Sequence, residues 1–177
     1  MSSVATPPSL SLSALPLAGL RLVLEPLRVE HAQEMAPLLD DAGLHVFIGG
    51  RPASRRELQE QYRSQVVGRS PNGLQCWLNW VLRRREDGRA VGTVQATVTE
   101  EQDEPVAEVA WVVAAPFQSR GYAREGAQLI VAWLRDQGVV TVRAHVHPEH
   151  AASQGVAQAV GLVKTSTVVD GEVRWEA

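Results

Sequence analysis

The most constraining feature of this sequence is the stretch 108–124, EVAWVVAAPFQSRGYAR, in which a strand-like run leads through a short loop into a helix. The helical pattern covers 122–137 and ends at Gly138, a residue type typical of helix C-caps. N–H groups at a helix start lack partners within the helix, and together with the helix dipole they attract anions. Gly121 and the small Ala123 would let a ligand approach the backbone closely. The loop is therefore predicted to hold phosphate, although an ordinary strand-to-helix turn would explain the same residues.

The rest of the chain alternates between the two periodicities that mark strands and helices. The predicted strands are 20–27, 75–84, 90–98, 106–113, 139–146, 162–169 and 172–175. The predicted helices are 29–39, 54–67, 122–137 and 151–160, with a loop over 40–53. This order predicts a single α/β domain in which helices flank one mixed sheet.

Composition and length narrow the class of protein. The 177 residues fit one domain, and 45% hydrophobic residues suffice for a core. The segment 1–18 is rich in Ser, Pro and Leu and is predicted to be a flexible tail before a domain over 19–177. A net charge of −3 argues against a nucleic-acid partner. The single Cys76 cannot form an internal disulfide, and neither a targeting segment nor a membrane span is recognisable, so a cytoplasmic protein is expected.

Two segments carry a resemblance to a known family. The QSRGYA loop at 118–123 resembles the acetyl-CoA signature Q/R-x-x-G-x-G/A of the GNAT superfamily. Downstream, His150 and Ser153, followed by Gly-Leu at 161–162, resemble that superfamily's N-x-x-S/A segment ending in Gly-Phe. The EVAWVV run resembles a strand of the branch that acetylates ribosomal-protein N-termini and small amines. The resemblance is strongest over 108–162.

The resemblance implies a fold and an activity. The fold would be the GNAT acyl-CoA acyltransferase fold, a single mixed and mostly antiparallel central sheet flanked by helices. The activity would be N-acetyltransfer from acetyl-CoA to an amine, by direct attack in a ternary complex without a metal or a covalent enzyme intermediate. The acceptor would be a protein N-terminus or a small-molecule amine. A non-catalytic acyl-CoA sensor is the alternative, and another acyl donor or a homodimer stays open.

The resemblance also implies cofactor contacts. Backbone groups of the strand before the loop would pair with the pantetheine arm where two neighbouring strands splay apart. A backbone N–H near Val112 or Val113 would polarise the acetyl carbonyl. Loop amides would hold the pyrophosphate, and Arg120 and Arg124 would pair with phosphates. The predicted cofactor-binding residues are Trp111, Val112, Val113, Gln118, Ser119, Arg120, Gly121, Tyr122, Ala123, Arg124 and His150.

The sequence departs from the family pattern at three positions. His150 stands where the family has Asn, and Leu162 replaces the usual Phe. Ala157 stands where many members have a tyrosine that acts as general acid. Ser153 remains and is predicted to support the thiolate leaving group.

Two residues compete for the role of general base. The amine must lose a proton before it attacks, because free amines are mostly protonated at neutral pH. Glu108 lies on the strand leading into the loop, and His145 lies on the next predicted strand. Without a catalytic role, each would be an ordinary strand residue. A third possibility for proton removal is a chain of water molecules with no dedicated base. The predicted catalytic residues are Glu108, His145 and Ser153.

For other side chains the sequence gives weaker evidence of a function. His145, His147 and His150 form H-x-H-x-x-H, but no acidic or cysteine ligand is near in sequence, so no metal is predicted. The tryptophans are expected mainly in the core, with one as a pocket wall. In this fold, the mouth for the acceptor would be lined by His45, Arg51 and Tyr62.

Overall fold

The computed structural model describes residues 10–177, and these form one sheet covered by helices on both faces. The strands are β1 (Leu17–Ala18), β2 (Leu22–Pro26), β3 (Cys76–Arg84), β4 (Ala90–Glu101), β5 (Glu104–Val113), β6 (Thr141–Val146), β7 (Val163–Val169) and β8 (Glu172–Glu176). The helices are α1 (Ala32–Leu38), α2 (His45–Ile48), α3 (Arg55–Gln65), α4 (Tyr122–Asp136) and α5 (Ala151–Ala159), with 3-10 turns at Val29–His31, Ala42–Leu44 and Ala115–Phe117.

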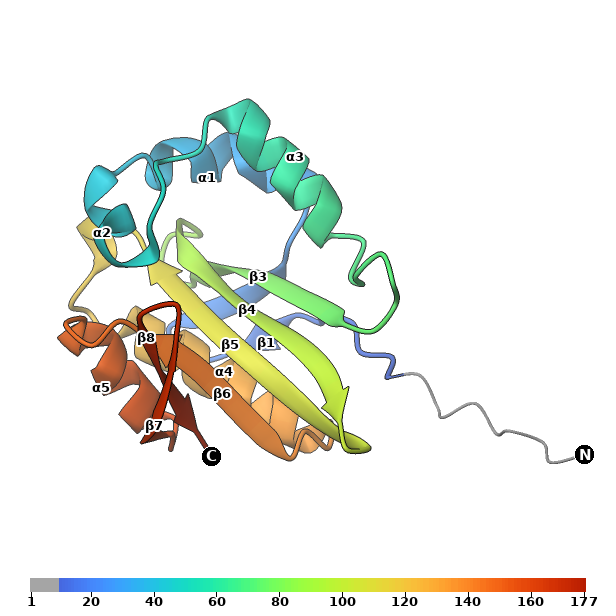
Figure 1. Ribbon diagram of the computed structural model, residues 1–177. Coiled ribbons are helices and arrows are strands. Elements are labelled where there is room, and N and C mark those ends of the chain that lie inside the picture. Colours follow the sequence, from blue (N-terminus) through green and yellow to red (C-terminus); the bar gives the residue numbers. More distant parts are fainter. Residues whose placement is uncertain (1–9) are drawn as a thin grey trace, which may run out of the picture.

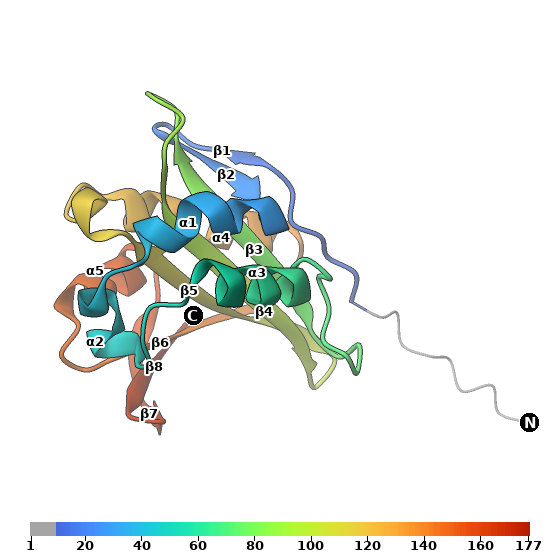
Figure 2. The ribbon, with the colours of Figure 1, turned by 90° about the horizontal axis from the view of Figure 1, so that it is seen from above.

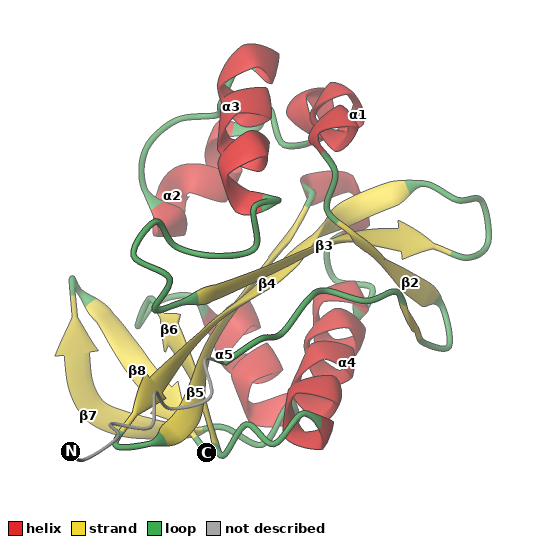
Figure 3. Cartoon of the chain, turned by 90° about the vertical axis from the view of Figure 1, so that its right-hand side faces the viewer, coloured by secondary structure: helices red, strands yellow, loops and turns green. Residues whose placement is uncertain are grey.

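The sheet has eight strands in the order β1-β2-β3-β4-β5-β6-β8-β7. Every neighbouring pair is antiparallel except β5 and β6, which run parallel. Helices α1 to α3 lie over one face, and α4 and α5 lie over the other (Figures 1 and 3). The expected single, mixed and mostly antiparallel sheet flanked by helices is therefore confirmed.

The main core lies between α4 and the sheet. Apolar residues recur on α4 at helical spacing, so one stripe of the helix, including Ile130 and Leu134, is fully buried. The stripe packs over the strand face that carries Trp80, whose ring meets Trp133 edge-to-face at 5.7 Å. Each such side chain stabilises the fold by about 1.5–3 kcal/mol through burial. This packing places the start of α4 close to the end of β5, to which it is joined by residues 114–121.

The predicted strands all occur, with ends that differ from the prediction by three residues or fewer; the largest difference is that β4 runs to Glu101. The loop predicted over 40–53 differs more, because it contains a 3-10 turn and the four-residue helix α2. Helix α3 begins as expected. Ser54 accepts from the Glu57 N–H, and the Glu57 carboxylate accepts from the Ser54 N–H at 2.8 Å.

The described part of the predicted tail, residues 10–18, is held against the core. Leu10, Leu12 and Leu17 pack on the main core, and residues 17–18 form β1 against β2. The Trp80 indole N–H donates to the Leu15 carbonyl at 2.7 Å, which satisfies a buried donor. A flexible tail over all of 1–18 is therefore not what this segment shows, and residues 1–9 lie outside the described residues.

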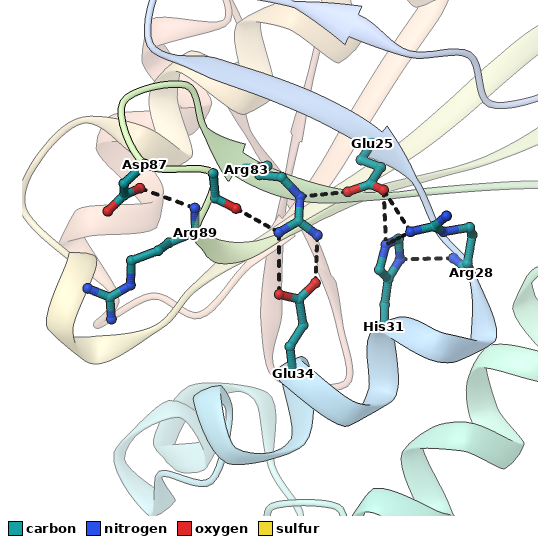
Figure 4. A network of polar contacts seen from close by, with 8 residues as sticks. Glu25, Arg28, His31, Glu34, Arg83, Asp87 and Arg89 are labelled. Atoms are coloured by element: carbon teal, nitrogen blue, oxygen red, sulfur yellow. Dashed lines mark hydrogen bonds and ion pairs between the residues drawn. The ribbon is translucent and has the colours of Figure 1, made fainter.

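A network of charges ties β2, α1 and β3 together (Figure 4). Arg83 contacts Glu25 at 2.6 Å and Glu34 at 2.6 Å, and Glu25 also lies 3.3 Å from the buried His31. Burial opposes ionisation of Glu25, but the Arg83 hydrogen bond and charge, with His31, hold the Glu25 pKa below its ordinary value. The network therefore holds α1 against the end of the sheet formed by β2 and β3.

Candidate active site

The site lies where β5 and β6 separate. The two strands pair only from Val106–Glu108 to Thr141–Arg143. Beyond this point a cavity of about 650 Å³ lies between them, lined by the end of β5, the start of α4, the end of β6, the start of α5 and α2. The splayed strand pair that the resemblance implied is thus present in the structure.

The backbone of β5 presents hydrogen-bonding groups to this gap. Polar groups of successive strand residues point to opposite edges of the strand. The Ala114 N–H donates to Val91 on the β4 side, and the Val112 carbonyl faces Gly92, where a Cβ would lie 2.0 Å from its oxygen. Trp111 and Val113 therefore direct their backbone groups toward the gap. Of the two oxyanion donors considered, Val113 is the one whose N–H faces the cavity.

The loop before α4 has the geometry of an anion site. Ser119 and Gly121 both have positive φ, 60° and 80°, so the backbone turns sharply between them. Gly121 is the N-cap of α4 and offers no side chain, and α4 has no side-chain cap. The first N–H groups of a 15-residue helix are thus left to a ligand. The Gln118 side chain donates to the Val113 carbonyl at 3.0 Å and holds the loop against β5.

The loop and the first turn of α4 are anchored by Arg21 and Leu22, at the start of β2. Glu125, in the first turn of α4, accepts from the backbone N–H groups of Arg21 and Leu22 at 2.7 and 3.0 Å. The Arg21 guanidinium pairs with Glu125 at 2.9 Å, donates to the Arg120 carbonyl at 2.7 Å and lies over the Tyr122 ring. Because the Tyr122 side chain is buried in the core, only its backbone can contribute to the anion site.

Ser153 and Trp111 meet across the cavity. The Trp111 indole N–H donates to the Ser153 hydroxyl oxygen at 3.3 Å, joining β5 to α5. The hydroxyl hydrogen of Ser153 stays available for another acceptor. Ala157, one turn further along α5, is fully buried and carries no group that can give a proton.

His150 is the N-cap residue of α5, a position at which Asn is a preferred residue. Its Nδ1 accepts from the Ser153 N–H, so the imidazole caps α5. Phe47 of α2 stacks on this ring with centroids 4.2 Å apart and lies 5.2 Å from the ring of His147 (Figure 2 shows α2 beside α5). Burial, with the nearby His147, lowers the pKa of His150.

Glu108 and His145 face each other at the cavity wall. The Glu108 carboxylate lies 3.9 Å from His145 Nδ1, and its side chain is 52% exposed. The Arg174 guanidinium, which can only donate, contacts His145 Nε2 at 3.4 Å. The neutral ring therefore carries its proton on Nδ1, toward Glu108. This tautomer leaves the carboxylate, rather than the imidazole, as the group with free lone pairs.

Most of the predicted site residues line this one cavity. All three predicted catalytic residues do so, as do the predicted cofactor residues except Arg120. The Arg120 guanidinium lies instead 5.9 Å from the Phe117 ring. Trp80 is buried in the core, whereas Trp111 is the tryptophan at the pocket wall. His45, Arg51 and Tyr62 line a second cavity of about 260 Å³ beside the first.

Sequence reasoning missed two contributors. Phe47 and its helix α2 close over the cavity, and Arg174 of β8 reaches His145 from a neighbouring strand. The signal for α2 was the apolar HVFI run between Gly43 and Gly49-Gly50. Arg174 had no local signal, because its role depends on the pairing of β8 with β6.

Within the described residues, no helix is long and apolar enough to cross a membrane. No curated protein matches the sequence significantly. Among solved structures, an acetyltransferase (GNAT family) from Bacillus anthracis has a TM-score of 0.74 and 14% identity, over 92% of this chain and 98% of that one. RimL, a ribosomal-protein alpha-N-acetyltransferase solved with coenzyme A, has a TM-score of 0.76 and 12% identity, over 92% and 97%. AAC(6')-Ib, solved with paromomycin and acetyl-CoA, has a TM-score of 0.72 and 16% identity, over 88% and 92%.

At these identities the structural likeness establishes the fold, and the family follows from the sequence itself. The profile of the acetyltransferase (GNAT) domain matches residues 21–163, which include the cavity, the loop before α4 and the capped start of α5. The groups that line the site also suit acetyl-CoA, because the β5 backbone groups facing the gap lead to the start of α4, which has no side-chain cap. This chain therefore belongs to the GNAT acetyltransferase family.

Proposed function

We propose that this protein acetylates the single primary amine of a peptide N-terminus or a comparable small amine in the cytoplasm. The observation that carries the proposal is the gap between β5 and β6, where the backbone groups that would bind the acyl donor and the half-exposed Glu108 carboxylate line the same cavity. Among residues 10–177, Glu108 and Glu172 are the only acidic residues lining the cavity, and no acidic residue of this range lines the smaller one beside it. A polycation such as an aminoglycoside would need more carboxylates, so an acceptor with one amine fits better.

Each residue has a distinct task in the transfer. The start of α4 binds the pyrophosphate, and the backbone of Trp111 and Val113 aligns the pantetheine arm. The Val113 N–H stabilises the negative charge that develops on the carbonyl oxygen. The amine nitrogen bonds to the acetyl carbon and the carbon–sulfur bond then breaks, while the proton that the nitrogen loses after attack passes to the sulfur, so that CoA leaves as a thiol. The Ser153 hydroxyl donates a hydrogen bond to the departing sulfur.

Glu108 receives the ammonium proton in this scheme, directly or through water, and His145 orients the carboxylate. The half-exposed position of Glu108 lets it pass the proton to solvent. His145 is a positioning residue, because Arg174 occupies its Nε2 and its Nδ1 proton faces the carboxylate. Removing Glu108 should therefore slow transfer more than replacing His145 with Asn.

The test is release of CoA thiol from acetyl-CoA in the presence of N-terminally free peptides, with the product identified by mass spectrometry. Glu108→Gln should lower kcat by about 10²-fold or more while the affinity for acetyl-CoA stays unchanged. A matched control is Glu100→Gln, an exposed carboxylate further along the sheet. Tight acetyl-CoA binding without thiol release from any amine would instead favour the non-catalytic sensor, which the buried Ala157 in place of an acid already recommends as the second candidate.

A further inference from the structure

Helix α2 is held in place by little of its own structure. It has four residues, none of them buried, and the side chains of Val46 and Ile48 are 71% and 58% exposed. So short a helix cannot stabilise itself, because fixing its first turn costs more conformational freedom than its hydrogen bonds return. Gly49 and Gly50 follow it with positive φ, and in the described chain no heavy atom beyond the adjacent residues lies within 4 Å of where a Cβ would be. The position of α2 must therefore depend on its contacts with other elements.

Phe47 supplies an aromatic contact between α2 and the far end of β6. Its ring stacks on the His150 imidazole, with centroids 4.2 Å apart and planes 25° apart, and lies 5.2 Å from the His147 ring. His147 follows β6 and His150 caps α5, so this ring cluster of Phe47, His147 and His150 joins α2 to both elements, beside which it lies in Figure 2. All three rings line the main cavity, together with Leu44 and Ile48 at the two ends of α2.

The hydrogen bonds of the ring cluster require a neutral His150. Its Nδ1 accepts from the Ser153 N–H at 3.4 Å, just as His147 Nδ1 accepts from the Glu149 N–H at 3.2 Å. An imidazolium has no lone pair to accept with, so protonation would set an N–H of His150 against that of Ser153 and turn the ring out of its stack. The face of Phe47 would attract the charge, but it cannot restore the lost acceptor. Burial, with the nearby His147, lowers the pKa of His150, as this arrangement requires.

The charged and titratable groups around the ring cluster do not stabilise a proton on His150. On the α2 side, Asp41 and His45 contact backbone groups of their own segment. On the other side are Glu108, Arg124, His145, Glu149 and Glu172. Glu108 lies 3.9 Å from His145 Nδ1, and among residues 10–177 no carboxylate forms an ion pair with His150. A proton on His150 would therefore weaken the ring cluster rather than strengthen it.

We propose that the ring cluster is a pH-sensitive latch, which holds α2 over the main cavity while His150 is neutral and releases it when His150 is protonated. In the released state His150 has its ordinary affinity for a proton, whereas the closed latch binds the proton more weakly. The closed state is therefore fully favoured above about pH 6.5, and below that value the equilibrium shifts toward release by up to about tenfold per pH unit. Release removes Leu44, Phe47 and Ile48 from the cavity wall and admits water, so transfer should slow in acid.

The experiment places a reporter on the latch itself. The chain has two phenylalanines, Phe47 and Phe117, so the full-length protein labelled with 4-fluorophenylalanine gives two fluorine resonances, which Phe47→Leu assigns. Broadening by a soluble gadolinium chelate measures how exposed each ring is to solvent between pH 5 and pH 8. The Phe47 resonance should broaden by about twofold or more when the pH falls from 8 to 5. Phe117, which is 4% exposed in the core, is the internal reference and should not change.

Two substitutions at position 150 separate the effect of the ring from that of its proton. His150→Tyr keeps an aromatic ring for Phe47 and takes up no proton in this pH range, so α2 should stay closed at pH 5. His150→Asn keeps the cap of α5 but offers no ring, so Phe47 should be exposed at both ends of the range. His45→Gln is the matched control. This histidine lies on α2 itself but contacts the Gly49 carbonyl, so its loss should leave the pH response as in wild type.

Three outcomes would overturn the latch. One is equal broadening of the wild-type Phe47 resonance at pH 5 and pH 8, and another is an unchanged pH response in His150→Tyr. The third is a Phe47 chemical shift that moves with pH while its broadening stays constant, because this would report a charge beside a ring that remains in place. The measurements use neither acetyl-CoA nor an amine, so they test the latch independently of the proposed transfer.

Discussion

The Trp111 indole N–H donates to the Ser153 hydroxyl across the candidate active site, at 3.3 Å. This contact joins β5, which would align the acyl donor, to α5, which carries the proposed hydrogen-bond donor to the leaving sulfur. Because the indole can only donate, it fixes Ser153 as its acceptor and turns the hydroxyl hydrogen away from β5. The orientation of Ser153 is therefore set by a residue 42 positions away in sequence.

Ser153→Ala should lower kcat by about 10-fold to 100-fold with little change in the KM for acetyl-CoA, because the hydroxyl acts mainly as the thiolate leaves. Trp111→Phe keeps the ring and removes the donor, so its smaller loss of kcat should vanish in the Ser153→Ala background. Thiol release at saturating amine measures both. Ser166→Ala, on the edge strand β7, is the control and should match wild type. Additive losses in the double variant would contradict the coupling.

Arg21→Ala tests the anchor beneath the loop before α4. The substitution removes the Glu125 ion pair, the bond to the Arg120 carbonyl and the contact with the Tyr122 ring. Because the arginine is partly exposed, unfolding free energy should fall by only about 0.5–1.5 kcal/mol. The KM for acetyl-CoA should rise by about threefold to tenfold as the loop loosens.

The matched control for the anchor is Arg56→Ala. Arg56 also pairs with a glutamate, Glu60, at 3.4 Å, but on the exposed face of α3. Its loss should change stability by less than about 0.5 kcal/mol and leave the KM unchanged. Equal effects of the two substitutions would mean that Arg21 acts as an ordinary surface pair.

The elements around the loop were predictable because their signals are local. Strand β5 and helix α4 differ in hydrophobic period, and Gly121 and Gly138 mark the ends of the helix. The position of the cavity followed from the family resemblance. Contacts such as Trp111–Ser153 and Arg174–His145 depend on tertiary packing and leave no trace in spacing along the chain.

Two segments show why prediction from local sequence signals was incomplete. Residues 10–18 have the Ser and Pro content of a tail, yet Leu10 and Leu12 pack on the core and the Leu15 carbonyl satisfies Trp80. Helix α2 has only four residues, too few for a helical period to be visible. Both segments are held by long-range contacts rather than by intrinsic preference, and α2 in particular helps to define both cavities.

The pKa of His150 gives the stability of α5 a predictable pH dependence. The folded-state pKa lies below the ordinary value of 6.5, so below that pH the unfolded chain binds a proton that the folded chain still excludes. The His150 contribution is therefore fully present above about pH 6.5 and is lost as the pH falls toward the folded-state pKa, at a rate of at most about 1.4 kcal/mol per pH unit.

His150→Asn should keep the cap of α5 and abolish this contribution, because Asn accepts the Ser153 N–H without titrating. His150→Ala should lose the pH dependence too, and also about 1 kcal/mol of stability at every pH through the missing cap. Chemical denaturation between pH 5 and pH 8 distinguishes the three proteins, with the difference between wild type and His150→Asn growing as the pH falls. A difference that is constant across this range would show that His150 charges equally well in the folded and unfolded chain, and that the Phe47 stack does not shield it.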